Sequence, residues 1–304
     1  MQLTRVGCGV YDLEATPPQH RSAEWARQCR WPNPYDVYQH RRRRATLVAL
    51  FERGPHAVAV GLGALALHGI AGVPLDFTPS IVNEFRSARN ATDSSQVRRY
   101  RHLRSESLAE GIRLSPLPDA LAQGLLELSQ QSAGNRDALA IADSIARRNV
   151  LTGDFEREFA ERLKCRRGAR NVRWIFGLRD QRSESPAESW ARYSCITSQC
   201  PPDQLQLTIV NAGGEVVARV DMAWQLPDGS LLLVEIDGAE VHSAPGAVYA
   251  DRTRQNSLVS VGKVLRFTGG DAWHGQVGHA VARELSGTGW IPGLNPLPQA
   301  ITLP

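Results

Sequence analysis

Residues 183–285 contain predicted helices and strands in one order: a helix, three strands, a helix, a strand and a last helix. The first helix has a clear start, because Ser185 is a favoured N-cap and Pro186 suits the first helical position. Apolar runs separated by NAGG and LPDGS predict the strands. This order is typical of an α/β domain. The strands are predicted at 205–210, 215–224, 231–238 and 263–268, and the later helices at 246–262 and from about 271 to 285.

The front of the chain has a different pattern, mainly helical with a few short strands. At 304 residues the chain is long enough for two domains. We expect an α+β domain at 1–178, an α/β domain at 179–287 and an extended tail rich in Pro and Gly at 288–304. In the first domain, apolar spacing predicts helices at 45–54, 60–69, 113–130, 136–150 and 152–163, strand-like pieces at 79–85 and 94–103, and a basic connector at 164–173.

Cysteine usage and the apolar segments bear on the compartment. The five cysteines are odd in number and none has CxxC spacing, so neither a disulfide framework nor a zinc knuckle is indicated. The N-terminus lacks an apolar segment of signal-peptide length. The longest apolar stretch, 57–75, contains four glycines, a histidine and a proline, and is typical of a buried helix and turn rather than a membrane span. We therefore expect a cytoplasmic protein that does not enter a membrane.

Charge is distributed unevenly along the chain. Residues 1–180 carry a net positive charge and 181–304 a net negative one, within a total of +4. A basic front half attracts a polyanion such as DNA, and an acidic back half can gather carboxylates for a cation. Simple spreading of charge over solvated faces is the alternative. The candidate nucleic-acid contacts in the front half are Arg41, Arg42, Arg43 and Arg44, which a solvated helical turn would also explain.

Two carboxylates, Asp221 and Glu235, lie on neighbouring predicted strands. If the hairpin loop has three or five residues centred on Asp228, these two residues are directly opposed, with Cβ atoms about 5 Å apart. A two-residue turn would instead place Glu235 against Met222. Opposed like charges are destabilising unless a cation lies between them, and two carboxylates with a main-chain carbonyl, here that of Ile236, suit Mg²⁺ or Mn²⁺. The alternative is an open hairpin with both acids in solvent.

The phrases ESPAESWAR, VARVDMAW, LLVEIDGAEVH and YADRTRQNSLVSVGKVLRFT resemble the actinobacterial branch of the very-short-patch-repair-like endonucleases, within the PD-(D/E)XK superfamily. The resemblance implies a mixed sheet flanked by helices and a metal-dependent phosphodiesterase site. Asp221 matches the acid of the PD element and Glu235 the acid of the (D/E)XK element. Asp237 stands where the superfamily usually has lysine, which leaves the general base unassigned.

Four further residues match or neighbour this motif. Glu188 matches a helix acid that contacts metal or water, although Ser185 and Glu188 also form the pattern of a capping box. His242 follows the third strand and is a candidate general base or acid, or merely a polar loop residue. Asp251 and Arg254 are expected either to form a buried ion pair or to have a functional role. In the functional role they orient His242 or bind a phosphate.

Arg266, on the last strand, either forms an ion pair at the edge of the core or contacts the scissile phosphate.

The front half more weakly resembles an AbiEi-type antitoxin-like module, in which 6–13 would end the wing of a truncated winged helix. His68, on an apolar helix, is expected to be a core histidine.

From these features we expect a metal-dependent DNA endonuclease, with a non-catalytic nucleic-acid-binding regulator or antitoxin-like protein as the alternative. Contact of the first domain with a protein partner or a second copy of the chain is left open.

Overall fold

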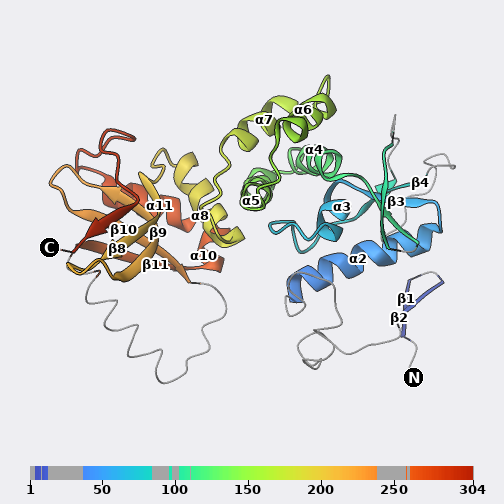
Figure 1. Ribbon diagram of the computed structural model, residues 1–304, viewed down its shortest axis with the longest axis horizontal. Helices are drawn as coiled ribbons and strands as arrows, with labels where there is room; N and C mark the ends of the chain where they lie inside the picture. Colours follow the sequence, from blue (N-terminus) through green and yellow to red (C-terminus); the bar gives the residue numbers. More distant parts are fainter. Residues whose placement is uncertain are drawn as a thin grey trace. The chain divides into compact units, whose positions relative to one another are not determined.

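The computed structural model describes residues 4–7, 9–12, 37–83, 96–97, 103–109, 111–237, 258 and 261–303. The chain divides into two compact units, Met1–Arg179 and Asp180–Pro304. Both are α/β in composition, and each contains a mixed five-stranded sheet with helices against it (Figure 1). Among the described residues, no helix is both long enough and apolar enough to cross a membrane.

The first unit is built on a sheet with the strand order β5-β4-β3-β7-β6. The pairs β3–β4 and β6–β7 are antiparallel, whereas β3–β7 and β4–β5 are parallel. A separate hairpin joins β1 to β2. The elements of the sheet and hairpin are β1 (Thr4–Gly7), β2 (Val10–Asp12), β3 (Ala57–Val60), β4 (Ser80–Asn83), β5 (Gln96–Val97), β6 (Glu106–Ala109) and β7 (Ile112–Leu114).

Six helices complete the described part of this unit, and one of them corrects the sequence prediction. The segment 164–173, expected to be a connector, contains the start of helix α7, which buries Val172, Ile175 and Phe176. Its apolar residues lie three and four apart, and the arginines between them obscured that period. The helices are α2 (Val37–Arg53), α3 (Gly61–Leu67), α4 (Leu117–Leu128), α5 (Gly134–Arg147), α6 (Gly153–Arg162) and α7 (Ala169–Gly177).

His68 follows α3 and is a core histidine, as predicted. Its Nε2 atom lies 3.0 Å from the Ser115 carbonyl oxygen. Burial lowers the pKa of His68 from its ordinary value of about 6.5, against an opposing effect of the Ser115 hydrogen bond. The folded state therefore resists protonation of this ring more than the unfolded chain does.

We expect the stability of the protein to fall as the pH drops below about 6.5, because the unfolded chain then binds a proton that folded His68 does not. Above that pH, His68 is neutral in both states and contributes no pH dependence. Urea denaturation at pH 8 and pH 5.5 measures the loss. The variant His68→Gln keeps a polar group facing Ser115 and does not titrate, so its loss should be smaller; an equal loss would contradict this role.

The second unit contains the sheet β11-β10-β9-β8-β12. Strands β8, β9 and β10 form an antiparallel meander, and β11 and β12 add to its two edges in parallel. Helix α8 precedes the meander, and α10 and α11 follow β11 (Figure 1). The elements are α8 (Pro186–Thr197), β8 (Gln204–Val210), β9 (Val216–Gln225), β10 (Leu231–Asp237), β11 (Gly262–Thr268), α10 (Gly269–Trp273), α11 (Gln276–Leu285) and β12 (Ala300–Thr302).

Two predictions about this unit were wrong in detail. The helix expected from about 271 to 285 is two helices, α10 and α11, separated by Gly275, whose φ of 73° suits glycine. The tail was expected to be an extended appendage, but β12 pairs with β8 at the sheet edge. The helix expected at 246–262 lies almost wholly outside the described residues.

The β9–β10 hairpin has the three-residue loop that places Asp228 at its centre. Leu226 N–H donates to Ser230 O and Gly229 N–H to Leu226 O, both at 2.9 Å. Gly229 has a φ of 86°, which a hairpin loop of this length requires at its last position. The resulting pairs run from Leu231 with Gln225 to Val234 with Met222. This is the register expected for a loop centred on Asp228, and not the register that would place Glu235 against Met222.

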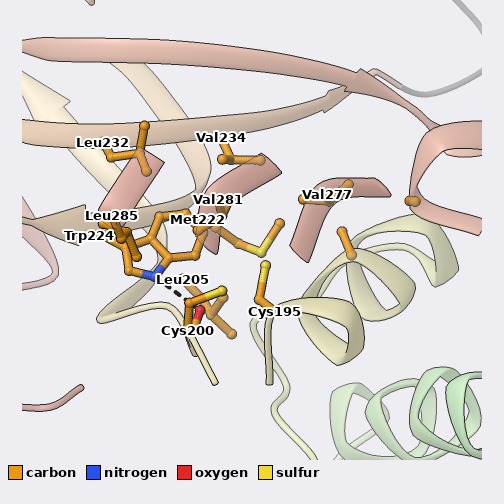
Figure 2. Close-up of a cluster of buried hydrophobic side chains, with 12 residues drawn as sticks. Cys195, Cys200, Leu205, Met222, Trp224, Leu232, Val234, Val277, Val281 and Leu285 are labelled. Carbon is orange, nitrogen blue, oxygen red and sulfur yellow. Dashed lines mark hydrogen bonds between the residues drawn. The ribbon is translucent and has the colours of Figure 1, made fainter. Parts of the chain in front are cut away.

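The core of the second unit lies between the sheet and the helices α8, α10 and α11. Trp224, fully buried, is its largest side chain and donates from Nε1 to the carbonyl oxygen of Cys200 at 3.2 Å (Figure 2). The same Nε1 atom lies 3.1 Å from the carbonyl oxygen of Pro201. Such a bond matters because a buried indole N–H without a partner would cost stability. This packing fixes α8 against the meander and so positions the side chains at the N-terminus of the helix.

Candidate functional site

Four polar side chains form a row across the sheet of the second unit. Glu235 of β10 pairs in register with Arg266 of β11. Continuing the β9–β10 register by one step places Asp221 opposite Glu235, and the β8–β9 register places Gln206 opposite Asp221. The order across the strands is therefore Gln206, Asp221, Glu235 and Arg266.

In strands β8 and β9, the side of the sheet to which alternate side chains point changes at this row. Leu205 packs in the core beneath the helices, whereas Leu207, two residues on, packs in the cluster on the other face. Residues two apart in a regular strand share a face, so the alternation breaks between them. Gln206 has a φ of 52°, a left-handed conformation. The same change of face occurs in β9, between Val220 and Met222.

The Asp221 carboxylate lies where β9 and β10 cease to pair. Its Oδ2 atom accepts a 2.7 Å hydrogen bond from Ile236 N–H, and its Oδ1 atom accepts one of 3.2 Å from Gln206 Nε2. The group of Ile236 in contact with Asp221 is therefore its N–H, not the carbonyl that was expected as a metal ligand. Asp221 is held from two sides by donors, which fixes the direction of its carboxylate.

Glu188, in the first turn of α8, points to the same place. Its Oε2 atom accepts bonds from Gln206 Nε2 at 2.9 Å and from Glu184 N–H at 2.8 Å. Ser185 caps the helix, accepting from Glu188 N–H, but the Glu188 carboxylate is bonded to Glu184 rather than to the cap residue of a capping box. Burial, and then the negative charge of Asp221, raise the pKa of Glu188 above its usual range.

Glu235 is buried and forms an ion pair with Arg266. The distance from Arg266 Nε to Glu235 Oε2 is 3.0 Å, and the Arg266 side chain remains 31% exposed. The ion-pair interpretation of Arg266 is thus confirmed, and its contact with a scissile phosphate stays a prediction. The guanidinium compensates the negative charge of the buried Glu235 carboxylate.

The remaining motif residues are placed in part or not at all. Asp237 ends β10 and is exposed. His242, Asp251 and Arg254 lie outside the described residues, so their predicted roles stay predictions.

The donor set fits a hard divalent cation. Mg²⁺ and Mn²⁺ prefer carboxylate and amide oxygens, and Glu188 and Asp221 each place a carboxylate oxygen within 3.2 Å of the Gln206 amide nitrogen. The amide oxygen of Gln206 is buried and has no hydrogen-bond partner among the described residues. Counting His, Cys, Asp and Glu alone, no group of three close enough to hold a metal ion occurs in the described part of the chain. A metal site here therefore needs the glutamine.

Four arginines of the first unit, Arg41 to Arg44, were predicted to contact nucleic acid. The structure shows that one of them is buried and that others are exposed. Arg43 is buried and donates from Nε to the Ala66 carbonyl at 3.2 Å, which ties α2 to α3. It is not at the surface, so its predicted contact is wrong. Arg41, with its Nη2 atom 3.0 Å from Asp76, and Arg44 are exposed on α2.

Gln206 is the residue of this site that the sequence did not indicate. A glutamine within the run LQLTIV is typical of a solvent-facing strand position, and its irregular backbone leaves no trace in the residue pattern.

Comparison of the chain with protein-family models, curated proteins and solved structures found no match.

Proposed function

We propose that the chain is a divalent-metal-dependent DNA endonuclease with a PD-(D/E)XK-like core in the second unit. The observation that supports the proposal is the convergence of Glu188 and Asp221 on one amide group, at 2.9 and 3.2 Å. Carboxylates gathered from a helix and a strand are costly to bury without a positive group. A divalent cation would supply that group, and this supports the proposal.

In this proposal the chain's own residues bind and orient the reactants. Asp221, held by Ile236 N–H, keeps a fixed direction without rearranging. Arg266, partly exposed beside Glu235, is placed to contact a phosphate oxygen. When bound, Mg²⁺ or Mn²⁺ would neutralise charge at the attacked phosphate and lower the pKa of a water molecule. The proton acceptor is assigned to His242 on the resemblance alone.

A supercoiled-plasmid nicking assay with Mg²⁺ and with Mn²⁺ tests the endonuclease. The second candidate is a nucleic-acid-binding regulator that uses the same fold without cutting. The Glu235–Arg266 ion pair favours it, since Arg266 compensates this acid without a metal. Plasmid that is bound but never nicked under either metal would support the regulator.

For either function we propose that the exposed arginines of α7 bind DNA backbone. Arg170 and Arg173 are three residues apart, and both are exposed beside Trp174, which is 46% exposed. Positions three apart share one helix face, and arginines beside an aromatic ring suit phosphates and bases.

We expect the DNA affinity to fall steeply with salt, because each neutralised phosphate contributes about −0.9 to the log–log slope. The double variant Arg170→Ala and Arg173→Ala should reduce that slope by about two. The control is Arg157→Ala, since Arg157 is paired with Asp154 at 2.7 Å. Fluorescence anisotropy with duplex DNA between about 50 and 200 mM salt measures the slopes. Equal slopes for wild type and the double variant would exclude α7 from the interface.

A further inference from the structure

The Gln206 side chain has one satisfied end and one unsatisfied end. Its Nε2 atom donates to Glu188 Oε2 at 2.9 Å and to Asp221 Oδ1 at 3.2 Å. Its Oε1 atom is buried without a hydrogen-bond partner among the described residues, and the whole residue is only 6% exposed. A buried amide oxygen that accepts nothing costs about 1–3 kcal/mol, so its retention calls for a reason.

The orientation of the amide follows from the charges around it. With both carboxylates ionised, only the NH₂ group can face them, because the amide oxygen would be repelled. A cation between the carboxylates reverses this preference, since a cation repels the NH₂ group and attracts the oxygen. A half-turn of the amide exchanges Oε1 and Nε2 without moving the rest of the side chain.

The distances match this exchange. Neighbouring oxygen ligands of an octahedral Mg²⁺ ion, each at 2.0–2.1 Å, are about 2.9 Å apart. An oxygen at the present position of Nε2 would be 2.9 Å from one carboxylate oxygen and 3.2 Å from the other. Both separations are close to the spacing of neighbouring oxygen ligands in such a coordination shell.

We infer that Gln206 is a ligand of the divalent cation: its amide turns on binding, and Oε1 joins Glu188 and Asp221 around the metal. This inference rests on the proposed metal-dependent function and names a ligand beyond the carboxylates of the motif. It explains the unpartnered oxygen and the left-handed backbone of Gln206, which brings the side chain onto the face of Asp221. Without metal the same amide holds the two carboxylates together as a donor.

The test is calorimetric titration of the full chain with Mg²⁺ and with Mn²⁺, which needs no DNA and no turnover. Gln206→Met keeps the size of the side chain but removes both the donor and the ligand, and we expect binding to weaken about 10-fold or more. Gln206→Glu supplies a carboxylate oxygen at the same place. It should bind metal at least as tightly as wild type, although its melting temperature without metal should be lower.

The matched control is Gln204→Met, on the same strand. Gln204 is also buried, but its two amide atoms are satisfied by Arg182 and Gln299, at 2.8 and 2.9 Å. Its loss should leave the metal affinity unchanged. Thermal melting of each variant shows whether it is folded, and Gln206→Glu keeps the inference testable should Gln206→Met fail to fold.

The outcomes separate this inference from the function on which it rests. Wild-type affinity in Gln206→Met, or weakened affinity in Gln206→Glu, would overturn the ligand role and leave the metal-dependent function standing. A wild-type chain that releases no heat with either cation would instead remove the proposed function, and the ligand role with it.

Discussion

Asp221→Asn should abolish metal-dependent nicking of supercoiled DNA, with a loss on the order of 10³-fold or more, while DNA binding survives. The substitution keeps the size of the side chain, and its amide oxygen can still accept from Ile236 N–H. The negative charge is lost from the group that accepts hydrogen bonds from both Ile236 N–H and Gln206 Nε2. Cation binding loses a carboxylate there, whereas binding of the DNA polyanion loses a repulsive charge.

The matched control for this prediction is Asp228→Asn, an equal change of charge on the same hairpin. Asp228 is exposed at the loop and accepts from Ser230 N–H at 2.9 Å. Its hydrogen bonds in the described part of the chain are to Ser230 of the same loop, so nicking should remain near the wild-type rate. Nicking and duplex binding are measured on the same preparations. An Asp221→Asn protein that nicks as fast as the control would exclude Asp221 from the reaction.

The sequence predicted the scaffold of the site because local chemistry determines it. Ser185 and Pro186 define the start of α8, and the structure has the helix at that point. The loop around Asp228 determined the register of β9 with β10, in which Val234 pairs with Met222. Both depend on residues within a few positions of each other, which a pattern of residue types encodes directly.

The direction of the side chains could not be predicted in the same way. Alternation along β9 assumes a regular strand, and the structure breaks it beside Asp221. The partner of Glu188 is Gln206 of β8, eighteen positions away along the chain, on a backbone conformation that glutamine rarely adopts. The pairing of β12 with β8 likewise depends on tertiary context, because the tail has little strand pattern of its own. Contacts of this kind come from packing, not from local propensity.

The position of Glu188 depends on how closely α8 approaches α11. Gly278 of α11 donates from its N–H to Ser194 Oγ of α8 at 2.9 Å. A Cβ atom at Gly278 would lie 2.2 Å from the Ser194 carbonyl oxygen and 2.4 Å from its carbonyl carbon. These are backbone atoms that cannot turn aside, so glycine is required by the distance between the two helices.

We therefore expect Gly278→Ala to destabilise the protein by about 1–3 kcal/mol or more, although alanine favours helix formation at most positions. The helices must separate, and α8 then carries Glu188 away from Gln206. Gly269→Ala is the control, because its new Cβ would meet only Ala187 Cβ at an ordinary 3.7 Å. Urea denaturation measures both stabilities, and titration with Mn²⁺ measures the effect on the site. If Gly278→Ala is as stable as the control, the helices do not approach as closely as described, and the placement of Glu188 beside Asp221 loses its support.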